Sequence, residues 1–544
     1  MSNVAAAKSA NGNGGKTFFG HPKGLQTLFF TEMWERFSYY GMRAFLVVYV
    51  STSTALGGLG QSKATAGIVY ALYGSSIYLM SLPGGFIADR YIGQRMAVLI
   101  GGVIIMCGHI ALAVPGDVAF ITGLVLLVLG TGMLKPNVST IVGQLYAKND
   151  VRRDAGYTIY YMGINIGALL APIICGQLLA ESQDLRAFLK DNGISPNAAW
   201  HFGFGAAAVG MFAGIVQFVY GWKYLGDAGA APKKLAKGER EPVPSAVGII
   251  MAISAAIIGL FIWWRVDYGG EGKKILADCF GVGLIIVSGA TFVTLHNFIA
   301  RDHDEKRRVR AMMVLFLGCL SFFGLFEQAG STLSLFAEEK VHRELLGFNV
   351  TQSFYQTLNA GYVILIAPVF ALLWIALAKK GKEPTSVTKF SIGMVITALS
   401  FATLLPALLG PIADGGKVTG LYLFIFYLVS TLAELCISPV GLSTMNKLAP
   451  DRLAGFVMGI WFLATAVGYY IAGRAEHEVG SLAKHLDLHP TAGLFYLLIL
   501  FALMIALILY LLAGPVKRML AHEPPTDLPK AKVVAGGTGG DPST

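Results

Sequence analysis

The sequence of 544 residues is poor in charge, because Asp, Glu, Lys and Arg together make up only 14% of it. Hydrophobic residues make up 55%, and the mean hydropathy is +0.61. Soluble domains carry about 25% charged residues, so this composition excludes an ordinary soluble protein. Apolar runs long enough to cross a bilayer core recur along the chain, without the alternation of a membrane β-barrel. We therefore expect an all-α polytopic membrane protein.

Cysteine is scarce as well. The five cysteines all fall within apolar stretches, at Cys107, Cys175, Cys279, Cys319 and Cys436. An odd number in such positions argues against a disulfide framework, and the spacing fits no metal site. The sequence also lacks HExxH, GxSxG and any paired His/Cys nucleophile arrangement at membrane depth. We therefore expect no enzyme, no catalytic residue, no bound metal and no organic cofactor.

The N-terminal stretch MSNVAAAKSANGNGGK is polar and lacks the short apolar run and cleavage site of a signal peptide. The net charge of +10 does not indicate nucleic-acid binding, because topology explains it. Of the 42 Lys and Arg residues, 28 fall in the predicted cytoplasmic loops and tails and 10 in the outside loops. This bias follows the positive-inside rule and predicts that both termini are cytoplasmic.

The apolar runs predict fourteen transmembrane helices, at about 25–50, 64–88, 96–114, 118–145, 155–180, 201–224, 244–265, 276–299, 309–337, 352–378, 388–410, 418–446, 452–474 and 490–514. Two basic loops bracket the seventh and eighth spans, which leaves six spans before them and six after. We therefore expect two six-helix bundles around a cavity near the bilayer midplane. The predicted regions are a disordered tail (1–23), the first bundle (24–224), a basic linker with two additional helices (225–307), the second bundle (308–515) and a disordered cytoplasmic tail (516–544).

The first predicted span contains TEMWERFSYYGMR, from Thr31 to Arg43. At 100° per residue, its ionisable groups and both tyrosines share one helix face about 140° wide. These residues are Glu32, Glu35, Arg36, Tyr39, Tyr40 and Arg43. Charges at membrane depth cost roughly 3 kcal/mol each and normally face a partner or a water-filled cavity. We interpret this face as the wall of a pathway, and the alternative is a structural ion-pair helix end.

Other polar residues lie inside predicted spans. Lys135 precedes Pro136 in the fourth span, and it either contacts anionic substrate groups or coupling partners or acts as a structural counter-ion. Asn165 stands four residues after Tyr161 and either joins helices or contacts a ligand. The second half adds Glu327, Asn359, Glu434 and Trp461, and ordinary aromatic packing is the alternative for Trp461.

The clear mid-span charges do not balance. The cations are Arg36, Arg43 and Lys135, whereas the anions are Glu32, Glu35, Glu327 and Glu434. One carboxylate therefore lacks a cation unless it binds a proton, and we hypothesise that this surplus acid is a coupling-proton site. The cations gather in the first half and the isolated glutamates in the second. The resulting dipolar field suits a zwitterion with separated ends.

The segment GGFIADRYIGQR, Gly84 to Arg95, matches the loop signature of the major facilitator superfamily, G-x-x-x-D-R-x-x-G-x-R/K. Its charged residues Asp89, Arg90 and Arg95 can form a charge relay at the cytoplasmic mouth. We interpret them as gating residues, separate from substrate binding. The equivalent loop of the second half, ALAKKGKEPT (376–385), lacks the pattern.

Four motifs together resemble the proton-dependent oligopeptide transporter family (POT, or PTR2). The first is E-x-x-E-R-F-x-Y-Y-G, from Glu32 to Gly41, and the second is YYMGINIGALLAP, with Tyr160 for Phe and Ala168 for Ser. The segments G-x-G-x-x-K-P-N and A-E-L-x-x-S-P-x-G-L-S also match. The resemblance implies the major facilitator fold, with an inserted helix pair similar to that of bacterial members. It also implies di- and tripeptide uptake by alternating access, driven by protons across the bacterial inner (cytoplasmic) membrane.

The resemblance further implies residue roles. The residues matching Arg36 and Lys135 face the peptide carboxylate with Tyr39 beside them, and those matching Asn165, Asn359 and Glu434 hold the amino group. Glu32 and Glu35 match residues tied to proton coupling through Arg36 and Lys135, and Glu327 matches an acid that pairs with the position of Arg43. Tyr40, Tyr78 and Trp461 match pocket-lining aromatics. Animal relatives carry a histidine where this chain has Ala71, so coupling here must rest on carboxylates.

Two other functions remain open at this point. One is proton-coupled transport of nitrate or another small anion, for which Glu434 has no evident role. The other is a peptide sensor that binds without transport, although the chain has no large signalling domain. The expected partners are di- and tripeptides, protons and the lipid bilayer, with no nucleic acid.

Overall fold

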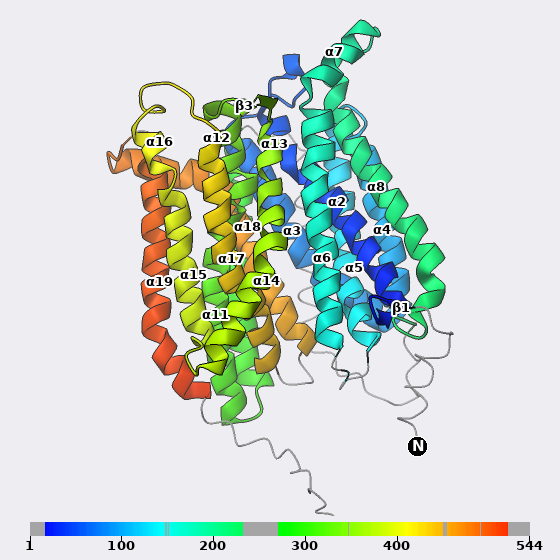
Figure 1. Ribbon diagram of the computed structural model, residues 1–544, viewed down its shortest axis with the longest axis vertical. Coiled ribbons are helices and arrows are strands. Elements are labelled where there is room, and N and C mark those ends of the chain that lie inside the picture. The colour runs from blue at the N-terminus through cyan, green and yellow to red at the C-terminus, as the bar shows by residue number, and fades with distance from the viewer. Residues whose placement is uncertain are drawn as a thin grey trace, which may run out of the picture.

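The computed structural model describes residues 17–146, 150, 152–231, 270–345, 347–449, 454–489 and 491–520. Within these ranges the chain is almost entirely helical, and the only strands are two short hairpins, β1 (Thr17–Phe18) with β2 (His21–Pro22) and β3 (Glu344–Leu345) with β4 (Phe348–Asn349). Long helices lie side by side, with the N-terminal half, blue to teal, beside the C-terminal half, green to red (Figure 1).

The long helices of the first half form one bundle. They are α2 (Gly24–Ser51), α3 (Lys63–Ile87), α4 (Gln94–Leu112), α5 (Asp117–Gln144), α6 (Arg153–Ala171) and α8 (Ala199–Gly221). Two π-helical segments extend α3 and α6, namely η2 (Ala88–Ile92) and η3 (Pro172–Ala180). A short helix, α7 (Gln183–Asp191), projects beyond the bundle before α8 (Figure 1). The main packing pairs are α4 with α5 and α2 with both α6 and α8.

The second half repeats this organisation. Its long helices are α11 (His303–Phe326), α14 (Thr357–Lys379), α15 (Ser386–Ala402), α17 (Leu421–Leu448), α18 (Ala454–His485) and α19 (Gly493–Leu520). Shorter helices continue or precede them: η7 (Glu327–Gly330), α12 (Thr332–Lys340), α13 (Gln352–Tyr355) and α16 (Leu405–Leu409). Within this bundle, α15 packs on α17 and α19, and α11 packs on α18.

One helix of the predicted inserted pair is described. It is α10 (Gly270–Thr294), which the π-helical segment η6 (Leu295–Ile299) continues. It contacts α18 and α3, one helix from each bundle. Asp278 of α10 forms an ion pair with the buried Arg474 of α18, at 2.7 Å. The additional helix is therefore attached to the bundles by a buried cation.

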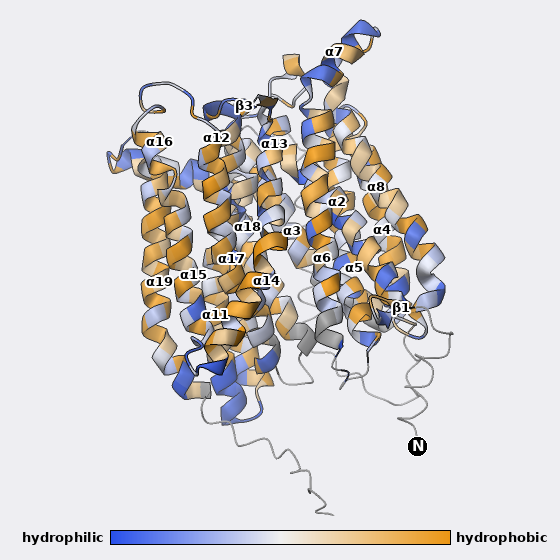
Figure 2. Cartoon of the chain, in the orientation of Figure 1, coloured by the Kyte–Doolittle hydropathy of each residue, from blue (hydrophilic) through white to orange (hydrophobic). Residues whose placement is uncertain are grey.

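Apolar residues dominate the middle of the helices, and polar residues gather at their ends (Figure 2). Among the described residues, eleven helices are long and apolar enough to span a membrane. The chain is therefore a multi-pass membrane protein. Helices occupy thirteen of the predicted spans, and the remaining one, 244–265, lies outside the described residues. The count of fourteen spans accordingly stays a prediction.

The observed elements differ from the predicted ones in four places. The N-terminal tail was expected to be disordered through residue 23, but Thr17 to Pro22 form a hairpin that His21 ties to the Tyr146 hydroxyl at 3.0 Å. At the other end, α19 continues to Leu520, past the predicted boundary at 515. The predicted single helix 309–337 is divided by η7, and α18 extends to His485, beyond the predicted end at 474. Hydropathy alone misses such ends, because polar helical turns continue outside the apolar segment.

The two bundles meet mainly through α3 and α18 and through α6 and α14. Close approach of α3 and α18 depends on two glycines, since a Cβ at Gly67 would overlap the carbonyl oxygen of Gly473 and the reverse also holds. The Ser75 hydroxyl on α3 donates to the Ala466 carbonyl at 2.7 Å, and Ser331 donates to the Ala472 carbonyl at 3.1 Å. Ser75 lies at the middle of α3, whereas the contacts of Gly67 and Ser331 lie toward the helix ends opposite the predicted cytoplasmic loops. The side predicted to face outward is therefore closed.

Candidate functional site

The first group of charges lies on one face of α2, as the spacing predicted. Arg36 donates to both carboxylate oxygens of Glu35, with 2.7 Å between Nη2 and Oε1, and its Nε lies 3.3 Å from Oε1 of Glu32. All three side chains are buried. Oε2 of Glu32 is also buried and has no hydrogen-bond partner among the described residues. One guanidinium thus serves two carboxylates, so a proton on either acid would change what Arg36 is free to bind.

The second group joins the two bundles. Arg43 of α2 forms a buried ion pair with Glu327, which begins η7 in the other half of the chain. The Tyr70 hydroxyl on α3 contacts both groups, at 3.0 Å from Arg43 Nε and 3.0 Å from Glu327 Oε2. This pairing of Arg43 with Glu327 is the one that the family resemblance implied. Tyr70 was not predicted, and the only signal in the sequence is its place in a tyrosine-rich apolar helix.

Lys135 of α5 has aromatic partners in place of a carboxylate. Its Nζ lies 3.8 Å from the ring centroid of Tyr78 and 5.7 Å from that of Phe462, a residue of α18. Lys135 forms no ion pair with any residue in the described parts of the chain. The helix α5 runs unbroken through Pro136 to Gln144. In this structure the Lys135 ammonium group is therefore held by aromatic ring faces.

Glu434 of α17 is the matching anion in the second bundle. The side-chain amide of Asn359 donates to its Oε2 at 2.7 Å and also lies 3.1 Å from the Thr431 hydroxyl. Glu434 has no cation at ion-pair distance within the described residues. It lies within electrostatic range of Tyr40 and Tyr161, which belong to the first bundle. Asn359 and Glu434, which were predicted to hold the same end of a peptide, are thus hydrogen-bonded to each other, and Glu434 faces the first bundle.

Three further residues were predicted to contact the substrate, namely Asn165, Trp461 and Tyr40. Asn165 is buried, and its amide donates to the backbone oxygen of Tyr161 at 3.0 Å, whereas the Tyr161 side chain is exposed. Trp461 is buried edge-on to Phe323, with 6.2 Å between ring centroids, so in this structure it packs within its own bundle. Tyr40 is half-buried, and the Arg43 guanidinium lies 5.5 Å from its ring centroid.

The aromatic residues also connect the two bundles. The Tyr39 hydroxyl lies 2.8 Å from that of Tyr469 on α18, and the Tyr469 ring lies 5.4 Å from the Tyr78 ring. Tyr78 in turn contacts Phe462 at 6.0 Å between centroids. Sequence reasoning missed Tyr469 and Phe462, although both fall in the WFLATAVGYY stretch that Trp461 opens. Only the packing of α3 on α18 reveals them.

The predicted gating loop is described in part. The side chains of Asp89 and Arg90 lie outside the described residues, so their relay stays a prediction. Arg95 donates to the carbonyl oxygens of Gly226 and Ala228, and its own N–H donates to the Gly229 carbonyl at 3.0 Å. In this conformation Arg95 therefore holds the start of the linker against the N-terminal end of α4, which is predicted to be cytoplasmic.

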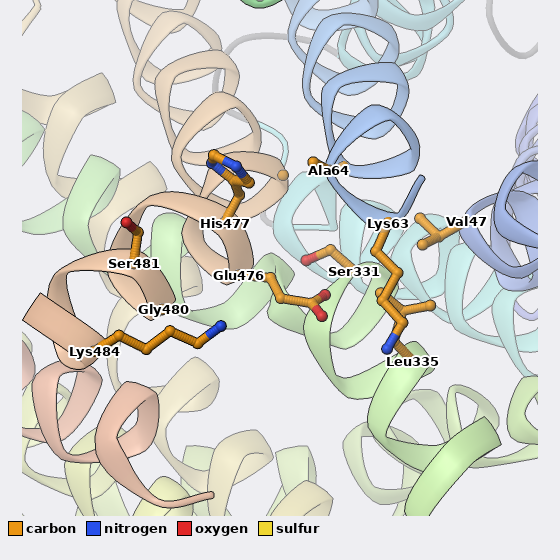
Figure 3. Close-up of a pocket in the computed structure, with 12 residues that line it drawn as sticks. Val47, Lys63, Ala64, Ser331, Leu335, Glu476, His477, Gly480, Ser481 and Lys484 are labelled. Atoms are coloured by element: carbon orange, nitrogen blue, oxygen red, sulfur yellow. The ribbon is translucent and has the colours of Figure 1, made fainter. Parts of the chain in front are cut away.

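A separate pocket of about 320 Å³ opens at the ends of α2, α3 and α18 that are predicted to face outward. Figure 3 shows Glu476 between Lys63 and Lys484, with Ser331 beside its carboxylate. Lys63 also forms an ion pair with Glu339 of α12 at 2.6 Å, across the two bundles. Both partners are substantially exposed, so this pair adds little to stability. The pocket lies on the side predicted to face outward, beyond the contacts of Tyr39 and Arg43.

Two packed bundles of apolar helices that carry buried charged side chains where they meet are typical of a membrane transporter. The chain belongs to the POT family, whose family model (PTR2) matches residues 95–479. The fold is that of the major facilitator superfamily. It is similar to a solved peptide transporter POT in complex with sulfate, at 37% identity and a TM-score of 0.78, over 94% of this chain and 99% of that one.

Curated relatives agree with this assignment. An uncharacterized transporter, YclF of Bacillus subtilis, is 41% identical over 93% of this chain and 96% of its own length. The peptide transporter YePEPT of Yersinia enterocolitica is 36% identical over 94% of this chain and 98% of its own length. A solved POT family transporter in complex with 5-aminolevulinic acid is 33% identical, with a TM-score of 0.78, over 92% of this chain and 98% of that one.

Proposed function

We propose that this protein is a proton-coupled symporter that imports di- and tripeptides by alternating access. The observation that carries the proposal is the separation of two unpaired charges, Lys135 on α5 and Glu434 on α17. A peptide has an ammonium group at one end and a carboxylate at the other. Arg36 and Lys135 receive the carboxylate, with Tyr39 beside them, and Glu434 receives the ammonium group together with Asn165 and Asn359.

This arrangement gives selectivity for peptide length. Backbone length sets the distance between the two charged ends, so two fixed recognition points accept short peptides and reject free amino acids. The side chains of the peptide fit in the space lined by Tyr40, Tyr78 and Trp461. These aromatic residues are uncharged and so do not select for peptide side chains of one charge. Relatives named as peptide or di-/tripeptide transporters support this substrate class.

Proton coupling follows from competition for one cation. Arg36 is paired with Glu35 and Glu32. A proton on Glu35 weakens its ion pair with Arg36 and leaves the guanidinium able to bind the peptide carboxylate. Lys135 shares in this exchange, and the pair of Glu327 and Arg43 links a second protonation to the contact between the bundles. Coupling of this kind requires only a difference in affinity between two states.

The orientation belongs to the same proposal. The basic loops face the cytoplasm and both termini are inside, in a bacterial inner (cytoplasmic) membrane. The closed outer side then makes this conformation one that releases substrate inward. Asp89, Arg90 and Arg95 act at the cytoplasmic side when the outer side opens.

The test is uptake of labelled dialanine into proteoliposomes, with and without an inward proton gradient. We expect accumulation that collapses with an uncoupler and yields to excess unlabelled tripeptide but not to free alanine. Glu383→Gln is a matched control, because Glu383 pairs with Lys389 at the end of α15, away from the proposed site. Binding without accumulation would indicate a sensor, and the absence of peptide binding with uptake of nitrate would indicate an anion transporter.

A further inference from the structure

Glu181 is a buried carboxylate at the outer end of the first bundle, one residue past η3. Only 4% of the residue is exposed. Its Oε1 accepts a hydrogen bond from Nε2 of Gln352 at 2.6 Å, and its Oε2 accepts one from the backbone N–H of Ser353 at 3.3 Å. Both donors belong to the start of α13 in the second bundle. The carboxylate therefore joins the two halves of the chain.

Three glutamine side chains extend this connection. Nε2 of Gln352 and Nε2 of Gln356 each donate to the Ala44 carbonyl of α2 at 2.8 Å. Gln177 of η3 accepts from the Thr351 N–H at 2.7 Å. We name this cluster the outer latch: Gln177, Glu181, Gln352, Ser353 and Gln356. Because its bonds cross between the bundles, they must break when the outer side opens.

The charges around Glu181 do not neutralise it. Arg186 of α7 lies within electrostatic range, but its guanidinium donates to the carbonyls of Ala180 and Pro196. Glu338 of α12 also faces Glu181 and is itself paired with Arg343 at 2.7 Å. Glu181 forms no ion pair within the described parts of the chain. Burial without a paired cation disfavours the charged form of a carboxyl group.

The latch also contains an acceptor that lacks a donor. Oε1 of Gln352 is buried and has no hydrogen-bond partner among the described residues. The Ala44 carbonyl can only accept a hydrogen bond, so the amide atom that faces it must be Nε2 of Gln352, and Oε1 is the atom left without a partner. A neutral Glu181 would carry a hydroxyl as a donor, and Gln352, whose Nε2 already bonds to Glu181, holds the unpaired acceptor Oε1. The neutral acid thus satisfies the closed latch better than the carboxylate does.

We propose that Glu181 is a proton-linked positioning residue of the outer gate, and that its neutral form holds the outer side closed. The inference rests on the proposed alternating access and adds a protonation step outside the substrate site. When the outer side is open, water solvates the carboxylate and the ionised form costs little. Protonation from outside therefore favours closure, and rising external pH weakens the closed state.

The test measures opening of the outer side without any substrate. Ser75 is fully buried between α3 and α18, and Ser75→Cys in a background without the five native cysteines gives a reporter at this contact. A membrane-impermeant maleimide added from outside labels it only when the outer side opens. Labelling rates are measured from pH 5.5 to pH 8 with Glu181, Glu181→Gln and, as the control, Glu344→Gln at the exposed start of β3. Glutamine mimics the neutral acid, because its amide can donate to Oε1 of Gln352.

We expect the labelling rate of the parent to rise with pH. Glu181→Gln should label slowly at every pH from 5.5 to 8, at the rate that the parent shows at acid pH. A difference of one pKa unit between open and closed states corresponds to at most about tenfold in their ratio. Glu344→Gln should behave as the parent. Glu327 is present in every variant, so any pH dependence that it causes cancels in the comparison.

Labelling of Glu181→Gln at pH 8 that equals or exceeds that of the parent would overturn the proposal. If this variant fails to give a monodisperse protein, Gln352→Leu provides the second test, because it removes the donor and the unpaired acceptor together. It should label faster than the parent at acid pH, and unchanged labelling would count against the latch. Peptide uptake is measured separately, so failure of the symporter proposal would appear there alone.

Discussion

The hydroxyl groups of Tyr39 and Tyr469 lie 2.8 Å apart, although 430 positions separate these residues in the chain. Both side chains are buried. The Arg36 guanidinium lies 4.9 Å from the Tyr39 ring, and the Tyr469 ring contacts Tyr78, above which Lys135 lies. The two proposed carboxylate-binding cations thus contact the aromatic residues that close the outer side. Movement of α18 away from α2 would change the surroundings of both cations.

The first prediction concerns Tyr469→Phe. This change keeps the ring contacts and removes one hydroxyl, which leaves the buried Tyr39 hydroxyl without its partner. The loss of about 1 kcal/mol from the closed state corresponds to roughly fivefold more opening. Maleimide labelling of Ser75→Cys measures it, and Tyr510→Phe on an exposed face of α19 is the control. Equal labelling of the two variants would show that the hydroxyl pair does not hold the gate.

The second prediction concerns the close approach of α3 and α18. A methyl group at Gly67 overlaps the Gly473 carbonyl, so Gly67→Ala forces the helices apart at the outer side. Overpacking of this kind costs about 1–3 kcal/mol, and here it destabilises only the closed state, in which the two helices touch. We expect faster outside labelling of Ser75→Cys and slower peptide uptake. Gly289→Ala on α10 is the matched control, because a Cβ there meets no atom within 4 Å.

The sequence predicted the fold well, because hydropathy and length are strong signals at membrane depth. Thirteen predicted spans coincide with helices, and the implied pairing of Arg43 with Glu327 is present. Arg43 and Glu327 could be singled out from the sequence because charges inside apolar segments are rare and expensive. The roles of these residues in binding and coupling stay predictions.

The outer latch could not be predicted. Glu181 follows the apolar run of η3 as an ordinary loop acid, and Gln352 precedes the next run in the same way. No motif or periodic spacing marks either residue. The two lie about 170 positions apart in the sequence, and their contact depends on how the two bundles pack together. The division of the span 309–337 at Glu327 was missed for a related reason, since apolar residues continue on both sides of it.

The third prediction tests the two recognition points by charge deletion. Glu434→Gln removes the anion that faces the ammonium group, and Lys135→Met removes a cation that faces the carboxylate. Each change should raise the half-saturating dialanine concentration at least about tenfold, because a charge-assisted hydrogen bond contributes about 1.5–3 kcal/mol. The measurement is competition by N-acetylated and by amidated dialanine against labelled peptide.

The blocked peptides assign each end. Glu434→Gln should no longer discriminate against the N-acetylated peptide, while it still discriminates against the amide. Lys135→Met should show the reverse pattern, with Arg36 retaining part of the carboxylate recognition. If both variants lose discrimination at the same end of the peptide, the assignment of ends to bundles is wrong. Glu383→Gln should leave both preferences unchanged, since its ion pair with Lys389 lies elsewhere.

The fourth prediction separates proton coupling from transport. Glu35→Gln keeps the shape of the side chain but removes its negative charge, as permanent protonation of Glu35 would. The side chain at position 35 then no longer attracts the Arg36 guanidinium by charge. We expect exchange of labelled for unlabelled peptide across the membrane to continue within a few-fold of the parent rate. Gradient-driven accumulation should fall to the level reached with uncoupler, because no proton needs to bind or leave at this residue. Full accumulation by Glu35→Gln would refute competition for Arg36 as the coupling step, and loss of exchange would assign Glu35 to peptide binding.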